Sequence, residues 1–161
     1  MKHQKYLAIF ALILITSLTA CSGGELTISD PWTRPALAGG NGAAYLVIQN
    51  GTGSDDVLLS ASTDAASVVE LHDVVQMDTS GTDSGDMSNS SDMAGGDMAM
   101  QMVKQENVPV PAGETVTFKP GSYHVMMIGL TSDLTEGDSI TLTLVFQNAG
   151  EVTIEVPVES R

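Results

Sequence analysis

Four side chains in this 161-residue sequence have the chemistry to bind a soft metal ion together: two imidazoles and two thioethers. They belong to His72, Met102, His124 and Met126. If residues 124–126 lie on a β-strand, His124 and Met126 leave it on the same face, roughly 6 to 7 Å apart. Imidazole and thioether ligands suit monovalent copper, whereas zinc favours cysteine or acidic ligands, and magnesium or calcium favours oxygen. Taken alone, His124-Val125-Met126 also fits a core methionine beside a hydrogen-bonded histidine.

The single cysteine, Cys21, stands at the end of a segment that is typical of an export signal. Two lysines precede an apolar run over residues 6–16, which is shorter than the about 20 apolar residues of a membrane-spanning helix. The segment ends in Leu-Thr-Ala-Cys, which resembles the lipobox of bacterial lipoprotein precursors. The sequence therefore predicts a signal peptide over residues 1–20, with an acylated Cys21 and a tether over residues 21–25. The alternative is an uncleaved apolar helix with an incidental cysteine.

An acylated Cys21 leaves the mature chain without a thiol. Such a chain cannot form a disulfide, a thiolate zinc site, an iron–sulfur cluster, a blue-copper centre or a cysteine-nucleophile active site. The sequence also lacks the serine, histidine and acid pattern of a hydrolase and any glycine-rich phosphate loop. We therefore expect a binding protein that is not an enzyme, with histidine and methionine as the ligands left for a soft metal.

The mature chain is strongly acidic. Removing 20 residues from 161 leaves 141, which fits one domain with a sizeable core. All 20 acidic residues follow Cys21 but only four basic residues do, so the formal side-chain charge is 4 minus 20, or −16. This charge argues against binding nucleic acid, and against docking on anionic lipid by charge. It is compatible with attracting a cation and equally with solubility alone.

Alternating apolar and polar residues indicate β-strands along most of the mature chain. The pattern is clearest over residues 139–146 and 152–158, which an Asn-Ala-Gly turn separates. Shorter stretches with strand character lie at residues 26–29, 44–49, 57–60, 67–75, 108–111 and 115–118, and around His124. Asp30-Pro31 is expected to end the first of these strands. About eight or nine short strands and no amphipathic helix predict an all-β fold, a sandwich or barrel with Greek-key connections.

Residues 78–96 differ from the rest of the chain, since Ser, Asp, Gly, Thr and Asn dominate and no strand or helix period is present. We predict a flexible insertion there. Methionines recur in and beside this segment, three of them directly after an aspartate: Met77, Met87, Met93, Met98 and Met100. They form either a secondary metal-capturing tether or a solvated insertion without a metal role.

The order and spacing of these residues resemble the PCu(A)C family of exported copper chaperones. That family has a His, a Met about ten residues later, then 21 residues, then His-X-Met. Here 21 residues separate Met102 from His124, and one separates His124 from Met126. Further matching pieces are Asp30-Pro31-Trp32-Thr33-Arg34, Gly42-Ala43-Ala44-Tyr45, Glu70-Leu71-His72, Pro111-Ala112-Gly113, Pro120-Gly121 and Gly137-Asp138. The resemblance covers nearly all of residues 26–158.

One spacing departs from the family pattern: 29 residues, instead of about ten, separate His72 from Met102. The surplus corresponds to the insertion at residues 78–96. Because the closure entropy of a loop grows only logarithmically with its length, an insertion at a hairpin tip can leave a site intact. The identity of the first methionine ligand stays open, since Met98 and Met100 share the strand parity of Met102.

The resemblance implies a cupredoxin-like Greek-key β-sandwich or barrel over residues 26–161 that binds Cu(I) through His72, Met102, His124 and Met126. It further implies delivery of copper to the dinuclear copper centre of cytochrome c oxidase, with an oxidase subunit or a second copper chaperone as the protein partner. Whether Cu(II) also binds is open. The lipidated cysteine would anchor the protein to the cell membrane, on its periplasmic or extracellular face.

Two other functions fit the same residues. A copper storage or resistance lipoprotein would use the methionines of the insertion and bind several copper ions per chain. A β-sandwich envelope lipoprotein without metal would use the same histidines and methionines for packing alone. Near the ligand candidates, Trp32 and Arg34 could line the mouth of the site by stacking, but we expect Trp32 in the core and Arg34 in an ion pair with a surface acid.

Overall fold

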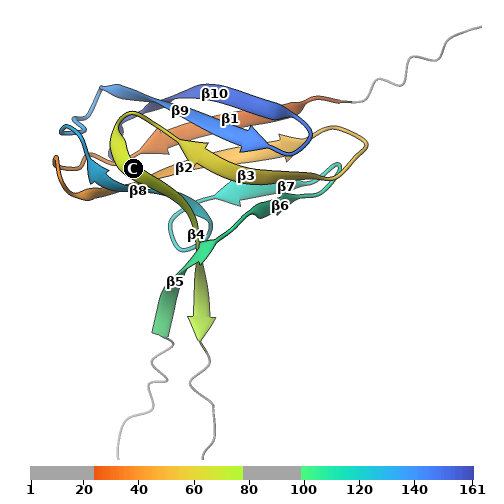
Figure 1. Cartoon of the computed structure of the whole chain (residues 1–161), viewed down its shortest axis with the longest axis horizontal. Helices are drawn as coiled ribbons and strands as arrows, with labels where there is room; N and C mark the ends of the chain where they lie inside the picture. The colour runs from red at the N-terminus through yellow and green to blue at the C-terminus, as the bar shows by residue number, and fades with distance from the viewer. Residues whose placement is uncertain (1–23, 78–98) are drawn as a thin grey trace, which may run out of the picture.

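The computed structural model describes residues 24–77 and 99–161, and the regular secondary structure in these two ranges is all β. In these ranges, ten strands form two antiparallel sheets that pack face to face (Figure 1). The strands are β1 Leu26–Thr33, β2 Asn41–Asn50, β3 Asp56–Ser62, β4 Ala66–Met77, β5 Ala99–Gln105, β6 Val108–Val110, β7 Thr115–Phe118, β8 His124–Leu130, β9 Ser139–Phe146 and β10 Gly150–Pro157. Within the described ranges, no helix is long and apolar enough to cross a membrane.

The larger sheet has six strands, in the order β1-β2-β8-β4-β5 with β7 also paired to β2, and the smaller sheet has the order β10-β9-β3-β6. β2 is long enough to take two partners along one edge: residues 41–44 pair with β8, and residues 46–49 pair with β7. Consecutive strands such as β2 and β3 lie in different sheets, as in Greek-key sandwiches. The predicted all-β sandwich is confirmed.

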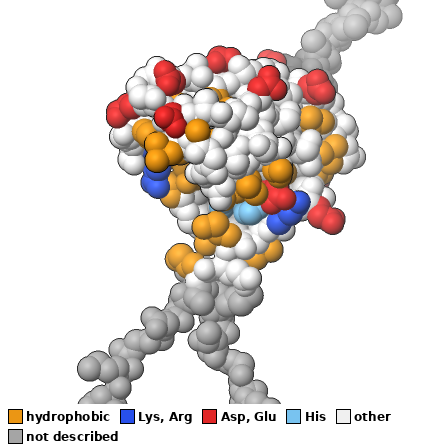
Figure 2. All heavy atoms as spheres, turned by 60° about the vertical axis from the view of Figure 1, so that its left-hand side comes forward, with side chains coloured by type: hydrophobic (Ala, Val, Ile, Leu, Met, Phe, Trp, Pro, Cys, Tyr) orange, Lys and Arg blue, Asp and Glu red, His pale blue; other side chains and the backbone are white. Residues whose placement is uncertain are grey.

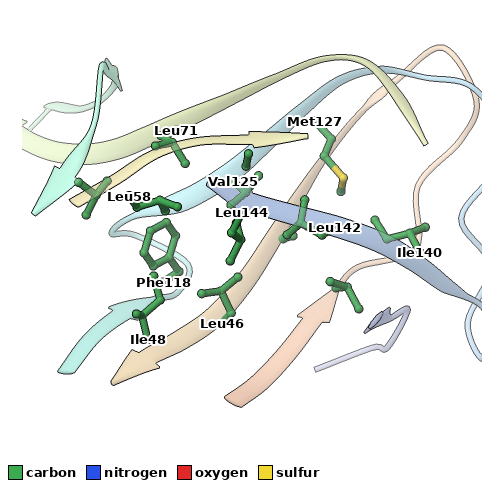
Figure 3. Close-up of a cluster of buried hydrophobic side chains, with 14 of the residues drawn as sticks. Leu46, Ile48, Leu58, Leu71, Phe118, Val125, Met127, Ile140, Leu142 and Leu144 are labelled. Atoms are coloured by element: carbon green, nitrogen blue, oxygen red, sulfur yellow. The ribbon is translucent and has the colours of Figure 1, made fainter. Parts of the chain in front are cut away.

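The core lies between the two sheets and is filled by side chains that alternate along the strands (Figure 3). In β9, every second residue from Ile140 to Phe146 is buried. β2 and β8 contribute Leu46, Ile48, Val125 and Met127 from the opposite sheet. Fully burying one large apolar side chain stabilises the fold by roughly 1.5–3 kcal/mol. This layer therefore fixes which residues of β2 and β8 face the core and which face outward.

The first strand does not end at Asp30-Pro31, so that prediction is wrong. β1 continues to Thr33, with a shift in register just before Trp32 and a φ of 50° at Asp30. A proline cannot donate to the hydrogen-bond ladder, but β1 is an edge strand, where an irregularity of this kind accommodates it. Beyond it, Trp32 pairs with Tyr45 on β2.

β4 and β5 form an arm that extends beyond the sandwich (Figure 1). β4 pairs with β8 from Ala66 to His72 and with β5 from Leu71 to Met77. In the described structure, the outer half of β4 therefore pairs with β5 alone. The predicted insertion at residues 78–96 follows β4 and lies outside the described residues, as do the predicted signal peptide and Cys21.

Candidate metal centre

The two candidate histidines are direct neighbours across the central strands of the larger sheet. β8 runs antiparallel to β4, and their register places His124 opposite His72. Leu71, Val125 and Met127 are buried in the core, so alternation along both strands turns the two histidines to the outer face. Directly opposed residues have their Cβ atoms about 4.5–5.5 Å apart. The two imidazole centroids lie 5.6 Å apart, with the rings inclined at 64°.

Both imidazoles are largely shielded from solvent although they lie on the outer face. His124 is 5% exposed, and the side chain of His72 is 14% exposed. Tyr45, on the neighbouring strand β2, has its ring centroid 6.5 Å from that of His124. Two imidazoles held this close together and mostly out of water differ from ordinary solvated surface histidines.

The two candidate methionines line one cavity together with His124. The cavity has a volume of about 380 Å³. Its lining residues are Arg34, Pro35, Ala36, Asn41, Gly42, Ala43, Tyr45, Val74, Met102, Pro120, Gly121, His124 and Met126. His72 is not part of this lining, and its ring packs against that of His124. Figure 2 shows histidine at the surface among hydrophobic side chains, next to a basic and an acidic group.

The register places the two methionines on either side of the histidine pair. Met126 lies opposite Glu70, two residues before His72 on β4. Met102 lies opposite Val74, two residues after His72. Because all these positions are even steps from His72, they share its face of the sheet. The methionine side chains therefore approach the cavity from two sides.

Among the methionines of the arm, Met102 lies nearest to the histidine pair. Met100 is opposite Gln76, two residues farther out along the arm, and does not line the cavity. Met77 pairs with Ala99 at the end of the described arm. Met87, Met93 and Met98 lie outside the described residues. Met102 itself is 63% exposed, so its thioether is accessible from solvent.

Each histidine has one ring nitrogen engaged by a neighbour. Nδ1 of His124 lies 2.9 Å from the backbone oxygen of Ser122, which can only accept, so Nδ1–H donates and Nε2 of the neutral ring carries the lone pair. Nε2 of His72 lies 2.9 Å from Oε2 of Glu70. Nδ1 of His72 is buried and has no hydrogen-bond partner within the described ranges. Leaving such an atom unsatisfied costs about 1–3 kcal/mol, and a metal ion bound to its lone pair would remove that cost.

Glu70 links His72 to Lys104. Its Oε1 accepts a hydrogen bond from Nζ of Lys104 at 2.6 Å, while its Oε2 faces His72. The Lys104 ammonium first, and the His72 imidazole second, hold the pKa of the Glu70 carboxyl below its ordinary value. No role for Glu70 was predicted from the sequence. Its place two residues before His72 on a strand, and hence on the same face, was the available signal.

Trp32 and Tyr45 flank the site on the side of β1 and β2. Trp32 is buried as expected, at 8% exposed, but it lies outside the hydrophobic cluster between the two sheets, and its ring centroid is 4.6 Å from that of Tyr45. The guanidinium groups of Arg34 and Arg161 lie over Trp32, at 5.6 and 5.3 Å from its centroid, within cation–π range. No acid in the described ranges pairs with Arg34, so the predicted ion pair is not formed there. Arg34 lines the cavity instead.

Around the histidine pair, the outer face of β4, β5 and β8 thus offers two imidazole nitrogens and the thioether sulfurs of Met102 and Met126. Within the described ranges, no three His, Cys, Asp or Glu side chains gather in a way that could hold a metal ion. A site of this composition fits poorly with the oxygen-rich coordination of calcium or magnesium, and a soft ion such as monovalent copper matches its sulfur donors.

Solved structures with this fold include several PCuAC domains. The copper-bound PCuAC domain from PmoF2 has a TM-score of 0.62 at 23% identity, and the match covers 87% of this chain and 97% of that domain. The apo PCuAC domain from PmoF1 has a TM-score of 0.63 at 23% identity, over 86% of this chain and 97% of that one. The solution structure of CuI-DR1885 from Deinococcus radiodurans has a TM-score of 0.54 at 21% identity, over 88% of this chain and 83% of that one.

Relatives in sequence include two bacterial proteins. The Leifsonia xyli subsp. xyli protein "Putative lipoprotein Lxx21020" is 28% identical over 132 residues, which are 82% of this chain and 68% of that protein. "Uncharacterized protein RP573" of Rickettsia prowazekii is 26% identical over 134 residues, and the match covers 64% of its length. The family model LpqE-like ("Putative lipoprotein LpqE-like") matches residues 26–158. The fold confirms the predicted resemblance to PCuAC domains. Because the family model matches most of the chain, the chain belongs to the LpqE-like family.

Proposed function

We propose that this protein is an exported, lipid-anchored metallochaperone that binds one Cu(I) ion through His72, Met102, His124 and Met126. The observation that carries the proposal is the direct opposition of the two histidines beside a cavity lined by both methionines. Each imidazole has one nitrogen engaged and the other available. Support for copper as the cargo comes from the fold neighbours, of which the PmoF2 domain is copper-bound and DR1885 was solved with Cu(I).

The donor set suits transport better than permanent binding. Neutral thioethers bind Cu(I) in exchangeable contacts, so a recipient with thiolates can take the ion. The absence of a cysteine ligand in the mature sequence argues against an electron-transfer copper site. Met102 adds a physical route for release, because it is exposed and lies on the arm beside the sandwich.

Export and anchoring are supported by the lipoprotein description of the family and by the predicted lipobox at Cys21. For the recipient, we propose the dinuclear copper centre of cytochrome c oxidase, reached directly or through a second copper chaperone. The resemblance in motifs supports this choice. Mixing the copper-loaded protein with the soluble copper-binding domain of an oxidase subunit, and following copper in each after separation, tests it.

The binding site is tested by anaerobic titration of the domain from residue 22 onward with Cu(I), in competition with a chelator of known affinity. We expect one tight site in the wild type. His124→Ala and Met126→Leu should lose it, because each removes a donor while leaving the core side of β8 unchanged. Met100→Leu is the matched control, since Met100 is exposed and outside the cavity. Unchanged affinity in the first two variants would mean that Cu(I) binds elsewhere and that these residues only pack, and no binding by the wild type would leave a β-sandwich lipoprotein without metal.

A copper storage role is separated from transport by stoichiometry. If Met87 and Met93 hold copper, the wild type binds several ions, and deletion of residues 78–96 reduces their number. If the segment captures copper for the site, the deletion lowers the rate of loading and leaves one ion per chain. An unchanged rate and stoichiometry would remove both roles from the segment.

A further inference from the structure

We propose that Glu70 is a positioning residue and that the two histidines bind the metal through different ring nitrogens, His72 through Nδ1 and His124 through Nε2. The metal-binding half of this inference rests on the proposed function. The other half concerns the hydrogen bonds of the metal-free protein, which exist whether or not copper binds.

For His72, the carboxylate of Glu70 decides which nitrogen keeps its lone pair. An ionised carboxylate has acceptors only, so the contact of 2.9 Å requires a proton on Nε2 of His72. The neutral ring then carries its lone pair on Nδ1. That atom is buried and has no hydrogen-bond partner in the part of the chain that the structure describes. It is therefore the nitrogen of His72 that is free to accept a metal ion.

For His124, a backbone carbonyl fixes the opposite tautomer. The oxygen of Ser122, two residues earlier in the chain, lies 2.9 Å from Nδ1 and can only accept. Nδ1 therefore carries the proton and Nε2 the lone pair. The two opposed imidazoles are thus held in different tautomers by two different neighbours.

Lys104 keeps Glu70 in place. It lies opposite His72 on β5 and reaches Oε1 of Glu70 at 2.6 Å, while Glu70 lies two residues before His72 on the same face of β4. The carboxylate is thus held from one side by an ammonium and from the other by the ring that it orients. Hydrogen-bonded carboxylates of this kind fix the tautomer and ring orientation of metal-binding histidines in other proteins.

The different nitrogens have a geometric consequence. Nδ1 is bonded to the ring carbon that carries the side chain, whereas Nε2 is at the far side of the ring. A metal ion bound to Nδ1 of His72 and Nε2 of His124 therefore lies nearer to the backbone of β4 than to that of β8. The two methionines also lie opposite residues of β4. Met102 is opposite Val74 and Met126 is opposite Glu70, which are the neighbours of His72 on its face.

The test is ¹⁵N-resolved NMR of the imidazole rings in the whole protein, at a pH high enough that the rings are neutral. In the metal-free wild type we expect the proton on Nε2 of His72 and on Nδ1 of His124. On addition of Cu(I), the nitrogen whose shift changes most should be Nδ1 in His72 and Nε2 in His124. Coordination of both rings through Nε2, or a proton on Nδ1 of metal-free His72, would overturn the proposal.

Variants separate positioning from mere stability. Glu70→Ala should leave His72 free to change its ring orientation and should weaken Cu(I) binding by roughly 10- to 100-fold. Glu70→Gln should recover much of that loss, because its amide oxygen can still accept from Nε2–H. Glu151→Ala, which removes an exposed acid on the other sheet, should change neither property. If Glu70→Ala has no more effect than Glu151→Ala on ring signals and affinity, Glu70 does not position His72.

The two proposals fail in different ways. Expected tautomers in the metal-free protein together with no Cu(I) binding would reject the proposed function and keep the role of Glu70. Tight Cu(I) binding with both rings coordinated through Nε2 would keep the proposed function and reject the positioning role of Glu70.

Discussion

Asp56 shows how one buried carboxylate can organise the end of the sandwich remote from the candidate metal site. It is 5% exposed. Its Oδ1 accepts hydrogen bonds from the backbone N–H groups of Val57 and Asn148 at 2.7 and 2.9 Å, and its Oδ2 accepts one from Ala149 at 2.9 Å. Burial alone would raise the pKa of Asp56, but these backbone donors outweigh it and lower the pKa below the ordinary value of 3.8. The turn between β9 and β10 is thereby tied to β3.

Asp56→Asn should lower the free energy of unfolding at pH 7 by about 1–3 kcal/mol, because the amide can accept fewer of these bonds. The folded-state pKa of Asp56 lies below the unfolded one, so its stabilisation is complete above the unfolded value and is lost as pH falls through the folded value. The difference between wild type and variant should therefore shrink in acid. Urea unfolding at pH 7 and at about pH 3 measures it.

Asp55→Asn is the matched control for this prediction, since Asp55 is an exposed neighbour whose side chain accepts a single backbone bond, from Ala112. Its effect should be smaller than that of Asp56→Asn. An Asp56→Asn difference that is equal at both pH values would show that the carboxylate charge is not what stabilises the turn.

The residues of the candidate site were predictable to different degrees. His124 and Met126 could be placed on one face from strand alternation, and the fixed spacing drew attention to Met102. The role of Glu70 was not predictable, and that of Arg34 at the mouth of the site was only the less favoured of two expectations. The first depends on a lysine that only cross-strand register brings within reach, and the second on a strand that continues past a proline. Such contacts depend on side-chain direction, which residue type and spacing do not specify.

Among the elements, the arm formed by β4 and β5 is expected to be less stable than the sandwich. Beyond His72, β4 has lost β8 as a neighbour, and residues 73–77 pair with β5 as a two-stranded ribbon. A ribbon of this kind is marginally stable by itself in water. Met102 lies on it, whereas His72 and His124 lie where the sheet is anchored to the core. One proposed ligand therefore belongs to a less stable element than the other three.

Native-state hydrogen exchange should reveal this difference in local stability between the arm and the sandwich. Backbone amides of the outer arm, such as those of Val75 and Gln101, should exchange about 100-fold or more faster than the ladder amides of Leu71 and Val125. Addition of Cu(I) should slow exchange at residues 101–103 in the wild type but not in a Met102→Leu variant. Equal protection along the whole of β4 would contradict the idea that the arm opens separately.

Most strands could be predicted because each has one face on the core, which imposes a period of two on the sequence. The pairing of β4 with β5 into an arm and the irregularity in β1 could not. In the arm the apolar pattern fades beyond Leu71, and at Asp30-Pro31 the local rule for proline is overridden by the position of β1 at the edge of its sheet. Which strands lie side by side was also beyond local pattern, since β8 pairs with β2 and β4 from distant parts of the chain.

At the scale of the whole molecule, positive charge gathers around the site. Arg34 and Arg161 lie over Trp32, Lys104 lies opposite His72, and Lys119 directly precedes the cavity-lining Pro120. These are the four basic residues that follow Cys21 in the sequence, against 20 acidic ones. Four basic residues neutralise only a small part of this negative charge, so repulsion between the acidic residues dominates.

Because of this excess negative charge, added salt should stabilise the fold by screening repulsion. We expect Tm to rise when NaCl is increased from about 10 mM to about 500 mM, as measured by circular dichroism. Glu151→Lys, which reverses an exposed charge far from the site, should raise Tm at low salt and reduce the dependence on salt. A Tm that falls with salt would mean that ion pairs such as that between Arg161 and Asp30 outweigh the repulsion.

β1 also sets the distance between the two ends of the molecule. The chain enters the sandwich at Leu26, and Trp32 beside the candidate site is six residues farther along the same strand, about 20 Å away at 3.3 Å per residue. Figure 1 shows β1 running along the sandwich. If acylated Cys21 holds the first end at a membrane, the second end stands above the lipid headgroups and turns toward the aqueous space. A partner could then exchange copper there without touching the bilayer, at any position that the tethered domain can reach above the membrane.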